Sequence, residues 1–347
     1  MSSLDWLPDA LHPVVMRLAR ADQLAYELAE VALAWSRGPD GNGPLEIQQV
    51  ERTPGFFDVE VSGIRPVPPV AAALFSETVH HLRSAIDNVV FYMVEKDRAE
   101  PLTDSQARAV SMLVYEDQVG FERKVKKLVR QGLGEFAETA TLGRRIAALQ
   151  PFADGSSVPS VPWPLSAVMG DAKPVEAHPL ALLRDYSNED KHRMIRLAAG
   201  RTLVQRLDDW AGSCRLGMRH IEVGTVLAVV ENGVPTEVDT SPAVHVQRPD
   251  SGVWVGPSYE LDCLSRHVTD IVLPTLVIGM ALPGGLPAQA DLSDTGVSLA
   301  DRLRRGGSRR AHDRFRDIAT KAHLESMGRE IRFPPIVAGV NLEPGES

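Results

Sequence analysis

Two short segments of the chain contain most of the side chains that could do chemistry. Residues 77–88 read ETVHHLRSAIDN, and residues 184–193 read RDYSNEDKHR. Histidine is the side chain best suited to proton transfer near neutral pH, while arginine and lysine stabilise phosphate charge. Together the two segments contain the parts of a general acid/base site for an anionic substrate.

The first segment is predicted to lie in a long helix of residues 70–96, which begins after a proline-rich stretch. At 100° per residue, one face of this helix carries a set of polar side chains: Glu77, His80, Arg83, Ser84 and Asp87. Three interpretations remain open. The face is solvated, with i,i+4 pairs such as Arg83 with Asp87, or it is a buried ion-pair network, or it is a functional site.

The second segment has two interpretations of equal weight. Ser187 and Asp190 approximate a capping box, which predicts that a helix restarts there. A continuous helix would instead place Arg184, Asn188 and His192 on one face. The candidate site residues of both segments, as catalytic groups or as a structural network, are His80, Arg83, Asp87, Asn188, Asp190, Lys191, His192 and Arg193.

Metal binding is expected to be absent, although carboxylate and imidazole groups are a workable ligand set. Glu77 with His80 or His81 and His192 would be the candidate ligands, but they lack tight metal-ligand spacing. No dinucleotide or phosphate-loop motif is present, so we expect no cofactor.

Patterning predicts an α+β fold, with helices in most of residues 10–200 and a small antiparallel sheet in residues 201–256. A β-hairpin is expected near the N-terminus, from residues 45–50 and 57–62. Further helices are expected at residues 13–35, 104–130 (with a break near Gly120), 135–149 and 178–199. A closing helix at residues 258–281 completes one body of residues 1–282, followed by a linker and a basic helical segment within residues 283–347.

The composition of the chain excludes several classes of protein. The chain has 347 residues, 44% of them hydrophobic, and a formal net charge of −9, which excludes wholesale disorder. Two cysteines exclude a disulfide scaffold and a cysteine-based zinc site. The longest apolar stretch, residues 271–286, is short for a bilayer and contains Pro274 and Pro283. We therefore expect a cytoplasmic protein with no membrane partner.

The charge is unevenly distributed. Residues 301–332 hold ten Lys and Arg against five Asp and Glu, so this segment carries +5 and the rest of the chain −14. The simpler interpretation is a segment that docks on its own acidic body or in a homodimer. The alternative is an anionic partner such as RNA.

The polar segments resemble a largely uncharacterised family of bacterial proteins that is frequent in actinobacteria. Its members carry a helix Glu-x-x-His-x-Leu-Arg-Ser-Ala-Leu-Asp, then Leu-Gln-Pro-(Tyr/Phe), then Asn-x-Asp-Lys-His-Arg. The matching stretches here are residues 77–87, 149–152 and 188–193, with Ile86 in place of leucine. The resemblance covers roughly residues 10–280 and implies no particular reaction.

A more distant likeness is to HEPN-type helical domains, many of which are metal-independent ribonucleases in defence and toxin systems. Their signature is an Arg and a later His on one helix, with four to six residues between them. Three pairs here have that spacing, about the number that chance gives, while Arg184 and His192 have seven residues between them. The likeness rests only on helical architecture and on the polar character of the candidate site.

These observations lead to two main hypotheses for the function. The first is a non-enzymatic ligand- or protein-binding module, in which the two polar segments form one buried network. The alternative is a HEPN-like ribonuclease, with His192 as general acid/base and Arg83, Lys191 and Arg193 on the phosphate. In that alternative, Asp87 and Asn188 would orient these groups.

Overall fold

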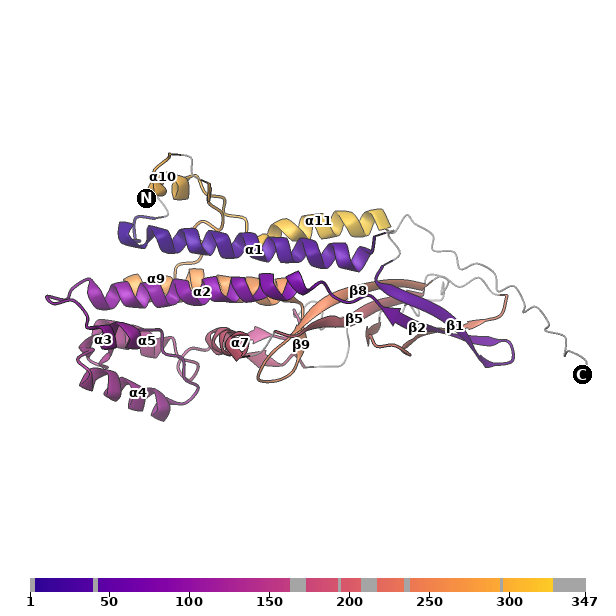
Figure 1. The fold of residues 1–347 in the computed structure, drawn as a ribbon, viewed down its shortest axis with the longest axis horizontal. Coiled ribbons are helices and arrows are strands. Elements are labelled where there is room, and N and C mark those ends of the chain that lie inside the picture. The colour runs from indigo at the N-terminus through magenta and orange to yellow at the C-terminus, as the bar shows by residue number, and fades with distance from the viewer. Residues whose placement is uncertain are drawn as a thin grey trace, which may run out of the picture.

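A computed structural model describes residues 4–39, 43–162, 173–192, 195–206, 217–233, 238–293 and 296–326. Two long helices, α1 (His12–Arg37) and α2 (Pro69–Glu95), lie side by side and form the spine of the molecule (Figure 1). Each has a proline in its first turn, where the missing N–H is not needed. The first helix ends at Gly38, whose φ of 70° is accessible to glycine at little cost.

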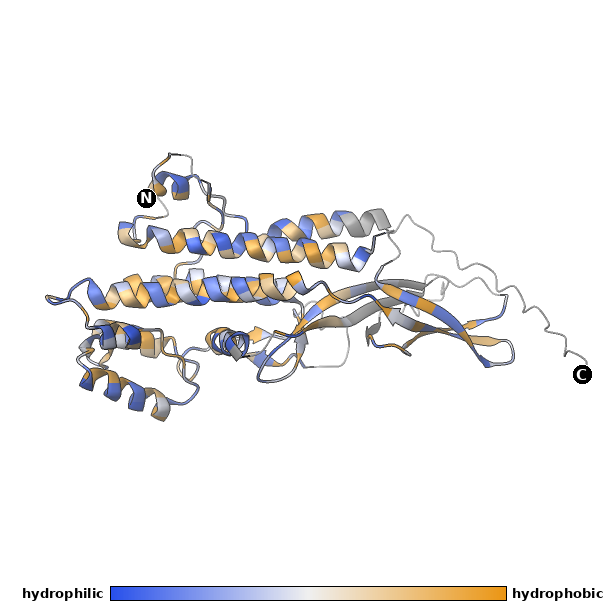
Figure 2. Cartoon of the chain, viewed as in Figure 1, coloured by the Kyte–Doolittle hydropathy of each residue, from blue (hydrophilic) through white to orange (hydrophobic). Residues whose placement is uncertain are grey.

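The main hydrophobic core lies between these two helices and the elements that cover them. Leucine, isoleucine, valine and phenylalanine recur at helical spacing on the facing sides (Figure 2). Leu28, Phe75, Leu82 and Ile86 are completely buried, and each such side chain contributes about 1.5–3 kcal/mol on burial. The helices predicted at residues 13–35 and 70–96 are therefore present as α1 and α2.

Two antiparallel sheets lie at one end of the spine. The hairpin β1 (Leu45–Thr53) and β2 (Phe56–Ile64) is joined by β7 (Val226–Glu231), in the order β1-β2-β7. The second sheet has the order β6-β5-β8-β9, from β5 (Leu197–Arg206), β6 (Gly217–His220), β8 (Val238–Gln247) and β9 (Trp254–Val255). The α+β class is confirmed, and the N-terminal hairpin gains a strand from the second half of the chain.

A group of short helices covers the other end of α2. It consists of α3 (Asp104–Ala109), α4 (Gln118–Arg130), the 3₁₀ turn η2 (Gly134–Phe136) and α5 (Thr141–Ala148). The break predicted near Gly120 lies instead at residues 110–117, because Asp117 caps α4 and accepts the Gly120 N–H at 2.6 Å.

The remaining helices close the structure. After the short strands β3 (Val158–Pro159) and β4 (Glu176–Ala177) comes α7 (Pro179–His192). The closing helix consists of α8 (Pro257–Arg266), a π-helical stretch η3 (His267–Val272) and α9 (Leu273–Ile278). Its π-helical stretch was not predicted from the sequence.

The charged C-terminal segment forms α10 (Leu299–Arg304) and α11 (Ala311–Ser326), and α11 lies along α1 (Figure 1). A short 3₁₀ turn, η1 (Asp9–Leu11), precedes α1. Leu286 and Leu303, which follow the boundary predicted at residue 282, belong to the main core. Among the described residues, no helix combines the length and the apolar character needed to cross a bilayer.

Candidate functional site

The polar residues of α2 hold an extended segment, residues 110–116, which we call the strap. The Arg83 guanidinium donates to the Met112 carbonyl oxygen at 2.6 Å, and the Met112 N–H donates to Asp87 Oδ1 at 2.8 Å. Arg83 Nε and Asp87 Oδ2 are 3.3 Å apart, so the predicted i,i+4 pair is present. Both side chains therefore fasten the backbone of one strap residue to the spine.

The segment 149–152 holds the strap from a second side. Gln150 is completely buried, and its Oε1 accepts the Tyr115 N–H at 2.9 Å. Its side-chain amide donates to the carbonyl oxygens of Leu113 at 2.8 Å and Ile146 at 2.9 Å. One side chain thus satisfies polar backbone groups of both the strap and α5.

The third contact comes from α7. Arg184 donates to the Val114 carbonyl at 3.4 Å and forms ion pairs with Glu116 at 2.5 Å and Asp185 at 2.7 Å. Its helix is continuous through Ser187, so the predicted helix restart there is wrong and the continuous helix is confirmed. The strap is therefore contacted by Arg83 and Asp87 of the first stretch that carries the family resemblance and by Gln150 of the second. It is also contacted by Arg184, which lies shortly before the third stretch.

The other predicted site residues are more exposed. Glu77 and His80 of α2 face solvent, as do Asn188, Asp190 and Lys191 of α7. The side chain of His192 and the whole of Arg193 lie outside the described residues. A cleft shared by these groups and Arg83 therefore stays a prediction, and the Arg83 guanidinium is already engaged with Asp87 and Met112.

His81 is half-buried beside the exposed His80, at 6.1 Å between ring centroids. Burial lowers the pKa of His81, and the nearby charges of Arg17 and Arg20 lower it further. Its Nδ1 is buried and has no hydrogen-bond partner among the described residues.

A buried ionic network that the sequence did not suggest joins α7, α8 and the end of β8. Arg248 and Glu260 are both 0% exposed and lie 2.8 Å apart, and Tyr186 donates to Glu260 at 3.1 Å. Arg248 also donates to the carbonyl oxygens of Val158 at 3.1 Å and Val175 at 3.0 Å. Burial and the neighbouring Glu260 raise the pKa of Tyr186 well above its usual value, so this phenol stays protonated.

A cavity of about 490 Å³ lies among α4, η2, α5 and Phe152. Its apolar wall consists of Phe121, Val125, Val129, Phe136, Ala137, Gly143, Ala147 and Phe152. Its polar rim consists of Gln118, Glu122, Lys126, Arg130 and Glu138. This volume is in the range of small-molecule sites, and no pattern in the sequence marks it.

A cluster of two histidines and one aspartate lies at the start of α7. His178 Nε2 is 3.2 Å from Asp154 Oδ2, and the rings of His178 and His267 stand edge to face at 5.5 Å between centroids. His267 is 5% exposed, and its Nε2 has no hydrogen-bond partner among the described residues. Burial and the neighbouring His178 lower the pKa of His267 to about 4, so this imidazole is neutral at pH 7.

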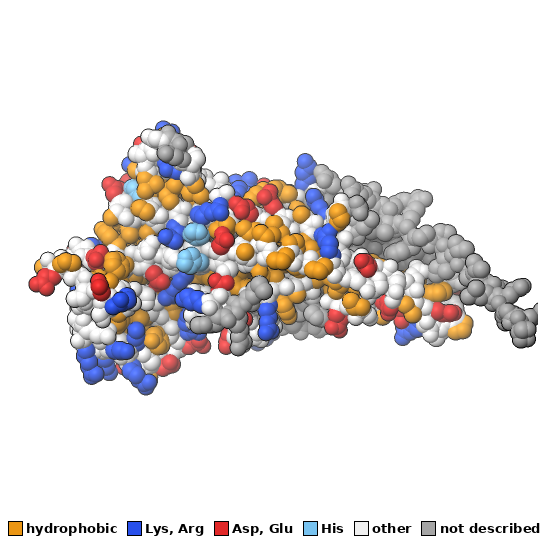
Figure 3. Space-filling view, viewed as in Figure 1, with side chains coloured by type: hydrophobic (Ala, Val, Ile, Leu, Met, Phe, Trp, Pro, Cys, Tyr) orange, Lys and Arg blue, Asp and Glu red, His pale blue; other side chains and the backbone are white. Residues whose placement is uncertain are grey.

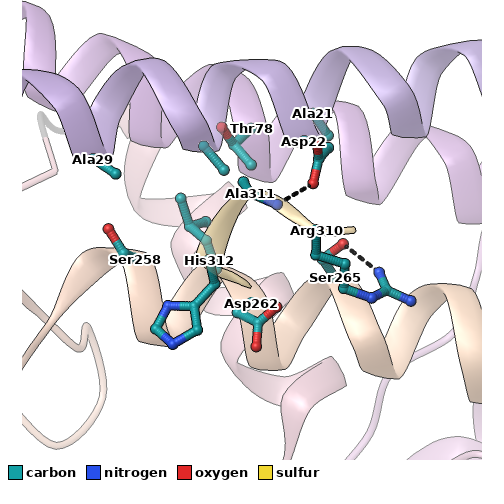
Figure 4. Close-up of a pocket in the computed structure, with 12 residues that line it drawn as sticks. Ala21, Asp22, Ala29, Thr78, Ser258, Asp262, Ser265, Arg310, Ala311 and His312 are labelled. Atoms are coloured by element: carbon teal, nitrogen blue, oxygen red, sulfur yellow. Dashed lines mark hydrogen bonds between the residues drawn. The ribbon is translucent and has the colours of Figure 1, made fainter. Parts of the chain in front are cut away.

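The basic segment contacts its own body through several arginines. Arg310 donates to Thr269 at 2.6 Å and to Asp270 at 2.8 Å, and Arg314 pairs with Asp22 at 2.8 Å. Asp22 also accepts the Ala311 N–H, as drawn in Figure 4. The cleft in that view has a volume of about 20 Å³, enough for a water molecule and too little for a ligand. These contacts agree with the expectation that the basic segment docks on its own acidic body.

No protein-family model, curated protein or solved structure matches the chain.

Proposed function

We propose that the protein is a non-enzymatic ligand-binding module that holds a small amphipathic anion in the α4 cavity. The observation that carries this proposal is the cavity itself, whose volume of about 490 Å³ suits a molecule with an apolar body. Its wall is mainly aliphatic and aromatic, which favours binding by burial of apolar surface.

The aromatic wall is supported from behind by the strap. The rings of Phe121 and Phe152 are 5.7 Å apart, and Phe121 contacts Tyr115 of the strap at 6.4 Å between centroids. Phe152 follows Gln150, which is tied to the backbone of Tyr115. In this proposal the polar residues around the strap are positioning residues that keep the wall in shape for its ligand.

The rim favours an anionic head group. Five of the 13 residues of α4 are Lys or Arg and one is Glu, and Figure 3 shows blue side chains gathered over the part of the molecule where α4 lies. Lys126 and Arg130 line the cavity mouth, and Lys126 is only loosely paired with Glu122, at 3.9 Å. A carboxylate or sulfonate next to an apolar body therefore suits the charge of the rim.

Fluorescence of 1-anilinonaphthalene-8-sulfonate, with decanoate as competitor, tests the proposal. We expect saturable binding to the folded protein and displacement by decanoate. Ala147→Trp fills the cavity and should weaken binding at least about tenfold. The double variant Lys126→Glu, Arg130→Glu should weaken it by a smaller factor.

The matched control is Arg123→Glu with Lys127→Glu, on the same helix but not among the residues that line the cavity. This control changes the net charge by the same amount and should bind the probe almost as tightly as the wild type does. Equal affinities of the wild type and Ala147→Trp, both checked for native circular dichroism, would contradict the proposal.

The ribonuclease alternative and an RNA partner for residues 301–332 remain predictions. The ribonuclease needs Arg83 on a phosphate, although Arg83 holds Asp87 and Met112. The RNA partner needs free cations, although Arg310 and Arg314 are paired with Asp270 and Asp22. A homodimer also remains a prediction.

A further inference from the structure

We propose that Asp154, His178 and His267 form a binding site for a divalent transition-metal ion such as Zn²⁺. One donor atom from each residue lies within 4.8 Å of the others. Two imidazoles and one carboxylate form a ligand set that suits Zn²⁺ and its neighbours better than Mg²⁺ or Ca²⁺, which prefer oxygen ligands. This site is separate from the α4 cavity and does not depend on its proposed function.

The burial of His267 and its unpartnered ring nitrogen support this metal site most strongly. Its side chain is almost completely buried, yet Nε2 lacks a partner among the described residues. A buried polar atom without a hydrogen bond is costly and calls for a reason, and a role as a ligand for a cation would supply one. The neutral imidazole that burial favours is also the form that coordinates a metal.

The local backbone places His267 there. It is the first residue of the π-helical stretch η3, which interrupts the closing helix between α8 and α9. Single π-helical turns inside helices are rare and often occur at functional sites. The π-helical turn is therefore a second feature, separate from the burial of His267, that is typical of a functional site.

The site is closed on one side and open on the other. The side chain of His178 is 8% exposed and that of Asp154 is 21% exposed, so solvent reaches the carboxylate. Three protein ligands leave one position of a tetrahedral ion for water. The structure thus favours an exchangeable ion with an open position over a fully enclosed structural one.

Metal binding requires one rearrangement, which itself can be measured. His178 Nδ1 accepts the Leu180 N–H at 3.2 Å, so the ring proton is on Nε2 and points to Asp154. When Nε2 coordinates a metal, that proton must move to Nδ1, and the hydrogen bond from Leu180 is lost. The uptake of metal therefore changes the tautomer of His178 at the first turn of α7.

Titration of the full-length, chelator-treated protein with Zn²⁺ tests the site by calorimetry, and Co²⁺ gives a visible spectrum that reports nitrogen and oxygen ligands. We expect one ion per chain, no binding of Mg²⁺, and a change of His178 tautomer in imidazole ¹⁵N spectra. His178→Gln and Asp154→Asn should each weaken Zn²⁺ binding by at least about tenfold, and His267→Gln by about 100-fold.

The matched control is Asp97→Asn, which removes an exposed carboxylate outside the cluster and should leave the affinity unchanged. If His267→Gln fails to fold, Asp154→Asn, at the solvent-facing side, keeps the test decisive. The proposal is overturned if the wild type does not bind Zn²⁺, or if the cluster variants bind it as tightly as the wild type does. Loss of probe binding in the α4 cavity would not affect either result.

Discussion

The side chain of Gln150, which is completely buried, accepts the N–H of the partly buried Tyr115 at 2.9 Å. The same side chain satisfies two carbonyl oxygens, one in the strap and one in α5. A single amide thus joins the strap to the helix that forms part of the cavity wall, and replacing it leaves several backbone groups without partners.

Gln150→Leu should therefore lower the free energy of unfolding by about 3 kcal/mol, since an unsatisfied buried group costs about 1–3 kcal/mol. Urea unfolding followed by circular dichroism measures this. Gln131→Leu is the control, because Gln131 is exposed and its substitution should change stability by less than about 0.5 kcal/mol. Equal effects of the two variants would show that the Gln150 contacts do not stabilise the fold.

Arg248 and Glu260 should behave as a strongly coupled pair. Glu260→Gln leaves a buried guanidinium without its counter-charge, which typically costs about 3–5 kcal/mol. The double variant Arg248→Met, Glu260→Leu should lose clearly less than the sum of the two single variants. The exposed pair of Arg304 and Asp301 is the comparison, with a coupling of at most about 1 kcal/mol.

Asp22 gives a prediction of pH dependence. Burial raises its pKa above 3.8, although hydrogen bonds from Arg314 and Ala311 oppose the rise. Because the folded protein then holds this proton more tightly than the unfolded chain, the contribution of Asp22 is complete below pH 3.8 and is lost as the pH rises through the folded pKa.

Raising the pH from about 3.5 to about 7 should therefore lower the free energy of unfolding of the wild type relative to that of Asp22→Asn. Urea unfolding of both proteins at both pH values measures this difference. A shift in the opposite direction would mean that the ion pair with Arg314 outweighs burial.

Gly143 allows a test of how closely α5 approaches η2. A Cβ at this position would lie 2.0 Å from the Ala137 carbonyl oxygen and 2.6 Å from that of Phe136. Gly143→Ala should lower stability by about 1–3 kcal/mol, since the backbone must move. Gly134→Ala, where a Cβ meets nothing within 4 Å, should be nearly neutral in thermal unfolding. If Gly143→Ala were equally neutral, the helices would be packed less tightly than described.

Local patterns predict the parts of the molecule that depend on local order. Apolar spacing and an early proline indicate α1 and α2, and the i,i+4 spacing of Arg83 and Asp87 indicates a pair that lies at 3.3 Å. Long-range partners leave no such signal. Arg248 and Glu260 look like ordinary surface charges in the sequence, and nothing there indicates that Arg83 binds the backbone of Met112.

The candidate metal ligands illustrate the same limit. His178 and Asp154 are 24 residues apart and both precede α7, whereas His267 comes from the π-helical stretch η3. Metal motifs are recognised by short fixed spacing between ligands, which this set lacks. The apolar cavity is equally hidden, because its wall consists of ordinary core residues from several elements.

Phe152 and Asp154 belong to one tight turn, in which the N–H groups of Ala153 and Asp154 both donate to the Gln150 carbonyl at 2.8 Å. One of these side chains lines the cavity and the other belongs to the His–Asp cluster. A cavity ligand that displaced the Phe152 ring and a cation that fixed the Asp154 carboxylate would thus act on the same short stretch of backbone. If binding at one site changes the affinity at the other, linkage requires the same factor in both directions, and this turn would be the part of the chain that couples them.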